Sequence, residues 1–415
     1  MEPMGSEWFR EAKYGLFVHW GLYSLLAGEY DGVRTDRIAE WIENFLDIPV
    51  EAYRKLAGQF DPKAFDADAF VRRAREDWGM RYIVLTAKHH EGFAMYHSRV
   101  SGFNVVDATP CRRDILGELR AACDKYGMRL GVYYSQAQDW DDPDGFKQHH
   151  DNSHKNFQRY FDEKCVPQVR ELLTNYAPLS VMWFDTPMGI TREQSQRLRD
   201  LCKGIQPDIL LSGRTGNGLG DYMTTGDNAL PRLPYDGLWE LPATVNDTWG
   251  YNKYDTNWKS PDQIIQTLLR VISRGGNYLL NVGPTGEGLV PQACADVLSA
   301  VGAYVRGNAE AIYGTRCVGV YPFEVPGIEM TSRSHKLYIH VLTPRVRIEL
   351  LNIANRITNA YLVSDKTPLP FTQGRTCEGD SMIEVSLPPA LQAGKNYCVC
   401  LETEEEAPVF EEIRA

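Results

Sequence analysis

The chain has 415 residues, of which 43% are hydrophobic and 24% charged, a composition typical of a globular protein with a large core. The 44 basic and 55 acidic residues leave a net charge of −11, which argues against binding to nucleic acid or to an anionic membrane surface. No apolar run approaches the roughly 18 residues of a membrane span. Nine cysteines are scattered without a CxxC pair, and the first residues, MEPMGSEWFREAK, lack the regions of a signal peptide. We therefore expect reduced thiols and a cytoplasmic protein.

Short apolar runs alternate with amphipathic stretches as far as about residue 315. The runs predict strands buried on both faces, and they lie at 15–20, 81–87, 128–135, 179–185, 208–213 and 277–283. Helical patterns, several of which begin at Ser or Asp or end in Gly, lie at 66–79, 113–127, 168–177 and 260–276. This alternation predicts an α/β fold with a (β/α)8-like TIM barrel, and an open doubly wound sheet is the alternative.

The sequence changes in texture after the barrel segment. Short alternating strands are predicted at 336–342, 346–352, 359–364, 382–388 and 397–402, separated by Pro, Gly and Asn turns. This spacing is typical of a small antiparallel β-sandwich. We therefore predict a catalytic barrel over residues 1–315 and a C-terminal β-sandwich over 316–415, with an acidic tail after Leu401 that we expect to be frayed.

Polar and aromatic side chains gather where the predicted barrel strands end, which is where barrels carry catalytic groups. They are His19, Trp20, Lys88, His89, His90, Glu91, Tyr133, Tyr134, Trp183, Asp185 and Arg214. Asp185 directly follows the apolar residues VMWF, and an ionised carboxylate beside a buried Trp is costly unless it has a function. The alternative is that Asp185 only caps a following helix at Thr186-Pro187.

A second carboxylate would make this edge of the barrel suitable for glycoside hydrolysis, which uses two carboxyl groups beside the scissile bond. The candidates are Glu40, Asp221, Asp227 and Glu240. Glu40 and Glu240 each adjoin a Trp, which can desolvate a carboxyl and raise its pKa as a general acid requires. Asp221 and Asp227 lie among Gly and Thr residues, which is a wetter setting.

The pair His89-His90 raises the possibility of a metal site, with Glu91 beside it. Adjacent strand residues point to opposite faces, so neighbouring histidines seldom bind one ion, and no HxH, HExxH or Cys/His spacing supports zinc. We therefore expect no metal and no cofactor, and we interpret the two imidazoles as hydrogen-bonding groups for a polyhydroxylated ligand. The Asp- and His-rich segment 139–155 is expected to be a solvated loop.

Several motifs together resemble the α-L-fucosidases of glycoside hydrolase family 29. The motifs are FREAKYGLFVHWGLYS (9–24), EWIEN (40–44), TAKHHEGFAMYHS (86–98), RRDILGELRAACDKYGMRLGVYYS (112–135), VMWFD (181–185), NDTWGY (246–251), GGNYLLNVGPTGEG (275–288) and AIYGT (311–315). They cover about 300 residues in the family's order. The family's fold, a (β/α)8-like barrel followed by a β-sandwich, matches the change of texture near residue 315.

The resemblance implies roles for individual residues. Asp185, the Asp of the W-x-D motif, corresponds to the nucleophile of a retaining double displacement. The residues implied to bind the sugar are His19, Glu40, Trp41, His89, His90, Tyr133, Trp183 and Arg214. The acid/base is where the chain departs from part of the family, because TTGDN (224–228) stands where many members carry a Glu. We favour Glu240, the Glu of a W-E motif, with Asp227 as the runner-up.

The resemblance thus predicts an exo-acting, retaining α-L-fucosidase whose partner is a fucosylated oligosaccharide or glycoside. The departure at Asp227 leaves one alternative open, a lectin-like protein that binds fucose on the same scaffold without cleaving it. A metal-dependent hydrolase is a third class, which loss of activity in a chelator would support. The sequence predicts neither the linkage preference nor the oligomeric state.

Overall fold

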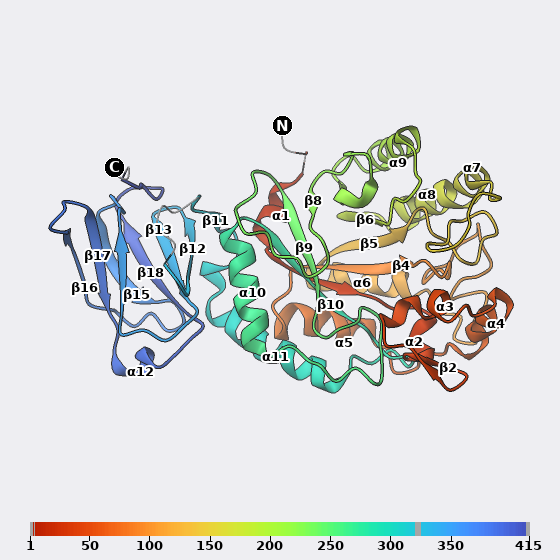
Figure 1. The fold of residues 1–415 in the computed structure, drawn as a ribbon, viewed down its shortest axis with the longest axis horizontal. Coiled ribbons are helices and arrows are strands. Elements are labelled where there is room, and N and C mark those ends of the chain that lie inside the picture. Colours follow the sequence, from red (N-terminus) through yellow and green to blue (C-terminus); the bar gives the residue numbers. More distant parts are fainter. Residues whose placement is uncertain (1–2, 4, 320–324, 412–415) are drawn as a thin grey trace.

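The computed structural model describes residues 3, 5–319 and 325–411. An α/β barrel and an antiparallel β-structure lie side by side, and helices α10 (Pro261–Ser273) and α11 (Gln292–Gly307) lie between them (Figure 1). Side chains of α10 bind the second part directly: Gln266 Nε2 donates to the Leu342 carbonyl at 3.1 Å.

Eight parallel strands form the curled sheet of the barrel, in the order β7-β6-β5-β4-β1-β10-β9-β8. They are β1 (Tyr14–Val18), β4 (Tyr82–Lys88), β5 (Arg129–Ser135), β6 (Val181–Asp185), β7 (Leu210–Leu211), β8 (Met223–Thr224), β9 (Trp239–Thr244) and β10 (Asn277–Val282). Because β10 pairs with β1, the ends of the predicted run of strands meet, which confirms the TIM-like barrel over the doubly wound alternative. Among the described residues no ladder joins β7 to β8, and at this seam the Gly213 N–H donates to Thr224 Oγ1 at 3.1 Å.

Helices form over the four predicted stretches, and two further long helices that were not predicted lie at Arg192–Ile205 and Gln292–Gly307. The longer ones are α6 (Ile115–Tyr126), α8 (Val166–Asn175), α9 (Arg192–Ile205), α10 and α11. Short ones are α1 (Glu7–Ala12), α2 (Tyr23–Leu26), α3 (Ile42–Phe45), α4 (Val50–Arg54), α5 (Ala67–Arg72) and α7 (Phe157–Tyr160), with 3-10 turns η1 (Ala39–Trp41), η2 (Lys55–Gln59), η5 (Gly213–Thr215) and η6 (Ala309–Ala311). The predicted helix 66–79 changes at Arg73 into a π-turn, η3 (Arg73–Asp77), and a second π-turn, η4 (Phe161–Cys165), precedes α8. A hairpin, β2 (Glu29–Tyr30) and β3 (Val33–Arg34), follows α2.

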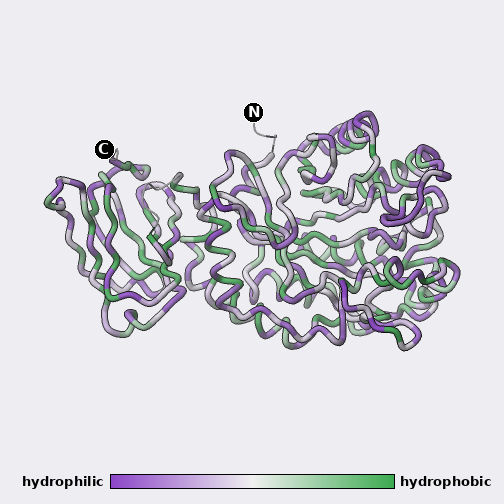
Figure 2. Tube along the Cα trace, viewed as in Figure 1, coloured by the Kyte–Doolittle hydropathy of each residue, from purple (hydrophilic) through white to green (hydrophobic). Residues whose placement is uncertain are grey.

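Two layers of apolar side chains hold the barrel together. One fills the space between the strands and the helices, and the other, which includes Phe17, Tyr82, Trp183 and Leu279, fills the inside of the barrel. Hydrophobic residues follow the inner strands, whereas hydrophilic ones gather on the outer loops and helices (Figure 2). The inside of the barrel is therefore a packed core, and a ligand has access only at an end.

The C-terminal part consists of two antiparallel sheets, as the sequence predicts. One has the order β11-β12-β13-β18-β15 and the other β14-β17-β16. The strands are β11 (Arg316–Cys317), β12 (Ile328–Arg333), β13 (Lys336–Val341), β14 (Arg347–Leu351), β15 (Ile357–Leu362), β16 (Phe371–Arg375), β17 (Ser381–Ser386) and β18 (Tyr397–Thr403), and a short helix, α12 (Pro389–Gln392), precedes β18. Buried residues from both sheets, such as Ile339, Ile348, Ile383 and Val399, form one core between them, which is the packing of a β-sandwich.

The acidic tail is not frayed over its described residues, contrary to our expectation. The Glu404 N–H donates to the Arg356 carbonyl at 3.0 Å, and the Glu411 N–H donates to the Asn352 carbonyl at 2.9 Å. These backbone hydrogen bonds fix the tail as far as Glu411 along the edge of the sandwich. Residues 412–415 of the predicted tail lie outside the described residues.

Candidate active site

A small cavity of about 130 Å³ opens at the carboxyl ends of the barrel strands. It is lined by residues from β1, β5 and β6 and from the segments that follow β1, β3, β4, β6, β7, β8 and β9. The lining residues are Phe17, His19, Ile38, Glu40, Trp41, His89, His90, Tyr133, Trp183, Asp185, Thr186, Arg214, Asp227 and Trp249. Of the residues to which the resemblance assigned a role, all except Glu240 line this cavity, whereas four other strand-end residues do not: Trp20, Lys88, Glu91 and Tyr134.

Asp185 ends β6 and is held by two donors. The Tyr133 hydroxyl donates to Oδ2 at 2.8 Å, and Arg214 Nη1 donates to Oδ1 at 2.9 Å. Asp185 does not cap the next helix, because α9 is capped by the side chain of Thr191. Thr186, the next residue, has a φ of 45°, and strained residues of this kind gather at functional sites. The carboxylate is thus oriented in the cavity by charge and hydrogen bonding.

Arg214 joins two carboxylates across the cavity. While Nη1 binds Asp185, Nη2 forms a short hydrogen bond with Asp227 and a longer one, at 3.3 Å, with the Thr225 carbonyl. The guanidinium also lies 4.9 Å from the ring centre of Trp183. Although burial alone would lower the pKa of Arg214, the Asp185 and Asp227 carboxylates raise it. Arg214 follows β7 at the open seam of the barrel. From this position it can bind both Asp185, at the end of β6, and Asp227, which follows β8.

Three histidines in the cavity are neutral at neutral pH. Burial lowers the pKa of His19 to about 4, and burial, with neighbouring positive charge, holds the pKa values of His89 and His90 well below the usual range. His19 Nδ1 lies 2.7 Å from Asn281 Oδ1, whereas Asn281 Nδ2 donates to the Trp249 carbonyl at 2.7 Å. We infer that His19 Nδ1 carries the proton, which leaves Nε2 as an acceptor. His89 Nδ1 is buried without a hydrogen-bond partner.

Glu40 has one carboxyl oxygen in use and one free. Oε2 accepts from the Gly250 N–H at 2.8 Å and from the Thr248 hydroxyl at 3.3 Å, whereas Oε1 is buried without a partner. Burial raises the pKa of Glu40 to about 7. Unpaired buried polar atoms cost free energy unless a ligand binds them. Glu40 Oε1 and His89 Nδ1 are therefore suited to meet ligand hydroxyl groups.

Glu240 lies below the cavity, at the amino end of β9, where it pairs in register with Asn277 at the start of β10. Trp183 Nε1 donates to Oε1 at 2.8 Å, and the Tyr82 hydroxyl donates to Oε2 at 2.7 Å. Burial raises the pKa of Glu240 to about 7, but the side chain is fully buried and does not line the cavity, whereas Trp183, which donates to it, does. Its location therefore does not favour the predicted acid/base role.

The sequence interpretation missed four lining residues, Phe17, Ile38, Thr186 and Trp249. Trp249 follows β9, and its ring centre lies 5.1 Å from that of His19. A strand assignment at 239–244 would have placed Trp249 in the loop that follows that strand. Asp221, which the sequence offered as a candidate for the second carboxylate, lies outside the cavity and binds Arg199 and Lys203 at 2.9 and 2.7 Å.

The loop after β5 is not solvated along its first half, contrary to our expectation. Asp139 is fully buried and Trp140 and Asp144 nearly so. The Trp140 N–H donates to the His90 carbonyl at 2.7 Å, so this loop packs directly behind a wall of the cavity.

Glu91, which follows His90, should make the stability of the chain depend on pH. Burial raises its pKa to about 8, even though the Leu22 N–H donates to its carboxyl at 3.1 Å. Between its ordinary pKa and pH 8 the folded chain binds a proton that the unfolded chain has lost, so stability falls as the pH rises through this interval. We expect the Tm of Glu91→Gln to change less between pH 5 and 8 than that of the wild type, as measured by calorimetry. Glu51→Gln, at an exposed position of α4, should instead follow the wild type, and equal slopes for all three proteins would contradict the assignment.

Other features bear on the class of protein. No group of three or more His, Cys, Asp or Glu side chains is arranged to hold a metal ion within the described ranges, and no helix there is long and apolar enough to cross a membrane. The nine cysteine thiols are free.

A barrel that brings two carboxylates, an arginine and a set of neutral polar and aromatic side chains around one small cavity has the site of a glycoside hydrolase. Comparison with known proteins narrows this class. The model of the α-L-fucosidase family matches residues 3–310. The chain belongs to this family, glycoside hydrolase family 29, and is an α-L-fucosidase that hydrolyses fucosides.

Similar proteins span animals and bacteria. A putative α-L-fucosidase of Caenorhabditis elegans is 32% identical over 76% of this chain and 67% of its own length, and the tissue α-L-fucosidase of Mus musculus is 32% identical over 76% and 72%. The crystal structure of α-L-fucosidase from Vibrio sp. strain EJY3 is 34% identical, with a TM-score of 0.89 over 97% of this chain and 73% of that one. An α-L-fucosidase from Lactobacillus casei in complex with its α-L-fucose product is 44% identical, with a TM-score of 0.68 over 71% and 97%.

Proposed function

We propose that the chain is an exo-acting, retaining α-L-fucosidase that releases terminal α-L-fucosyl residues by double displacement. Asp185 is the nucleophile and Asp227, rather than Glu240, is the acid/base. The observation that carries this proposal is the bridge by Arg214, whose two terminal nitrogens bind Asp185 and Asp227 across the cavity.

The bridge supports a retaining mechanism because one planar guanidinium binds both carboxyl groups. Carboxyl groups lie about 5–5.5 Å apart in retaining glycosidases and about 6.5–9.5 Å apart in inverting ones, which need room for a water molecule between carboxylate and sugar. Asp185 is nearly buried, whereas the side chain of Asp227 is 47% exposed. A buried nucleophile and an acid/base at the mouth suit a reaction in which the leaving group departs to solvent.

In the proposed reaction, Asp185 attacks C1 of the fucosyl group while Asp227 gives its proton to the departing glycosidic oxygen. Asp227, now a carboxylate, then takes a proton from a water molecule that attacks C1 and breaks the bond to Asp185. Fucose leaves with its configuration retained, and both side chains return to their starting states. Arg214 and Tyr133 hold the Asp185 carboxylate in position during both steps.

The neutral groups of the cavity suit recognition of an uncharged sugar. His19, His89, His90 and Glu40 offer donors and acceptors for hydroxyl groups, and a sugar that lacks one of these hydroxyls would leave a buried group unpaired. Aromatic side chains of the lining offer apolar surface for the C5 methyl group of fucose. A solved relative supports this substrate class, since a variant of the L. casei enzyme is known in complex with Fucα(1,6)GlcNAc.

The lectin-like alternative required the chain to lack an acid/base carboxyl. Asp227 lines the same cavity as Asp185, which supports turnover over binding alone. The fucosyl group itself is the largest part of a substrate that so small a cavity can hold, which supports exo action on terminal residues.

We expect the wild type to release 4-nitrophenol from 4-nitrophenyl α-L-fucoside, with α-L-fucose as the first sugar product in a proton NMR time course. Retention follows from two successive inversions at C1. Initial appearance of β-L-fucose would contradict the retaining mechanism. Binding of L-fucose without turnover between pH 4 and 8 would instead favour the lectin-like protein.

A further inference from the structure

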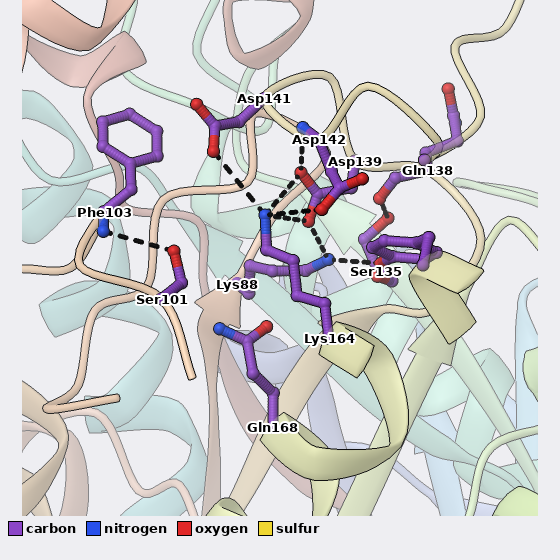
Figure 3. A network of polar contacts seen from close by, with 12 residues as sticks. Lys88, Ser101, Phe103, Ser135, Gln138, Asp139, Asp141, Asp142, Lys164 and Gln168 are labelled. Carbon is purple, nitrogen blue, oxygen red and sulfur yellow. Dashed lines mark hydrogen bonds and ion pairs between the residues drawn. The ribbon is translucent and has the colours of Figure 1, made fainter. Parts of the chain in front are cut away.

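A cluster of buried charged side chains surrounds Asp139 (Figure 3). Lys88, the last residue of β4, donates to Asp139 Oδ2 at 2.8 Å and to the Tyr160 hydroxyl at 2.8 Å. Lys164, from η4, donates to Asp139 Oδ1 at 3.1 Å and lies 3.6 Å from Asp141 and 3.8 Å from Asp142. Asp139 therefore stands between two lysines that come from different elements of the barrel.

The charges of the cluster balance. Arg54 adds a third cation, 2.6 Å from Asp141, against the carboxylates of Asp139, Asp141 and Asp142. The side chains of Lys88 and Asp139 are completely buried and that of Lys164 nearly so. Although burial alone would raise the pKa of Asp139, the two lysines lower it, so Asp139 keeps its negative charge.

Stability alone does not account for such a cluster. Transfer of ions from water to a protein interior costs several kcal/mol per ion, and apolar replacements of similar size are often neutral or stabilising. Directed ionic hydrogen bonds do, however, select one geometry of the loop that carries them.

That loop supports three lining residues of the cavity. The backbone N–H of Trp140, the residue after Asp139, donates to the His90 carbonyl. The Trp140 ring centre lies 5.3 Å from that of Trp41 and 5.5 Å from that of His90. Gln138, on the other side of Asp139, donates to Thr186 Oγ1 at 3.2 Å.

The orientation of the His90 ring depends on the same loop. His90 Nδ1 lies 2.7 Å from Ser135 Oγ, and the Ser135 hydroxyl donates to the Gln138 carbonyl at 2.7 Å. Ser135 thus accepts from His90 Nδ1–H, which fixes the ring. The chain of contacts runs from the ion cluster through residues 138–140 to His90, Trp41 and Thr186.

We propose that Lys88, Asp139 and Lys164 are positioning residues that hold the 138–140 segment in place and thereby shape the fucose-binding wall formed by His90, Trp41 and Thr186. This inference rests on the proposed function, since it assigns the wall to sugar binding.

The test is a charge-balanced double variant, Lys164→Met/Asp142→Asn, which removes one cation and one carboxylate and leaves Lys88 with Asp139. Because an error of about 1 Å in a binding group can cost about 100-fold in rate, we expect kcat/KM for 4-nitrophenyl α-L-fucoside to fall about 10- to 100-fold. The inhibition constant of L-fucose should rise by a factor of about five or more, because the same displaced side chains bind the sugar. Lys164→Arg, which keeps the charge, should retain most of the activity.

Lys125→Met is the matched control, because Lys125 pairs with Asp68 on the surface, and we expect it to change neither constant. Hydrogen exchange of peptides that cover 136–146 should rise in the double variant and not in the control. A lower Tm with wild-type kcat/KM and L-fucose inhibition well below that Tm would overturn the positioning role. If the wild type itself cleaves no fucoside, the proposed function is wrong. If the wild type is active but hydrogen exchange of 136–146 is unchanged in the double variant, the positioning role of the cluster is wrong and the proposed function stands.

Discussion

Asp185→Gly is expected to lose nearly all turnover, with kcat for aryl fucosides reduced by a factor of about 10⁴ or more. The side chain is proposed to form the bond to C1 in the first step, and a positioned intramolecular nucleophile replaces a bimolecular encounter with water. Arg214 now binds the carboxylates of Asp185 and Asp227, and loss of Asp185 leaves it with Asp227 alone of these two. Steady-state rates with 4-nitrophenyl α-L-fucoside measure the effect.

Azide distinguishes loss of the nucleophile from general damage. In Asp185→Gly the missing side chain leaves room for an anion, so azide should restore part of the turnover and give the fucosyl azide of inverted configuration. Asp185→Asn is the matched control, because it fills the space and still accepts from the Tyr133 hydroxyl but is a poor nucleophile. We expect it to be inactive with and without azide. A product azide of retained configuration would contradict the nucleophile assignment.

The fold could be predicted from the sequence wherever a strand forms one continuous apolar run. Strand β9 was not predicted, because Glu240 and Pro242 interrupt its apolar run, and β8 was not predicted because it has only two residues. Three strands of the C-terminal sheets, β11, β12 and β16, were also missed. In β16, residues 372–375 are all exposed, so no alternation of apolar and polar side chains marks the strand.

The residues that line the cavity could be predicted where they follow a recognised strand, because the ends of those strands were evident in the sequence. Two features lay beyond that reasoning. Glu240 adjoins a Trp in the sequence, yet a position at the amino end of β9 points it into the core, and sequence alone does not tell which end of an unrecognised strand a residue occupies. The charged segment around Asp139 resembled a solvated loop, since the cations that neutralise it, Lys88 and Lys164, lie elsewhere in the chain.

Asp227→Gly and Glu240→Gln should separate the two candidates for the acid/base. Removal of a general acid costs about 10²- to 10⁴-fold, and the cost depends on how much the leaving group needs a proton. We therefore expect Asp227→Gly to reduce kcat/KM far more for a fucosyl disaccharide than for 4-nitrophenyl α-L-fucoside. The ratio of the two kcat/KM values, measured for each variant and for the wild type, is the quantity to compare.

Glu240→Gln should leave this ratio unchanged. Its amide oxygen can still accept from Trp183 Nε1, and the Tyr82 hydroxyl can rotate to accept from its amide nitrogen, so the floor of the cavity stays in place. Glu240→Leu removes both carboxyl oxygens and leaves the buried indole N–H of Trp183 unpaired, at a cost of about 1–3 kcal/mol. We therefore expect kcat/KM to fall by the same factor for both substrates. If Glu240→Gln instead shows the dependence on the leaving group and Asp227→Gly does not, the proton donor reaches the sugar from below Trp183. The cavity would then have to open at its floor during catalysis, which hydrogen exchange of β9 in the presence of L-fucose would detect.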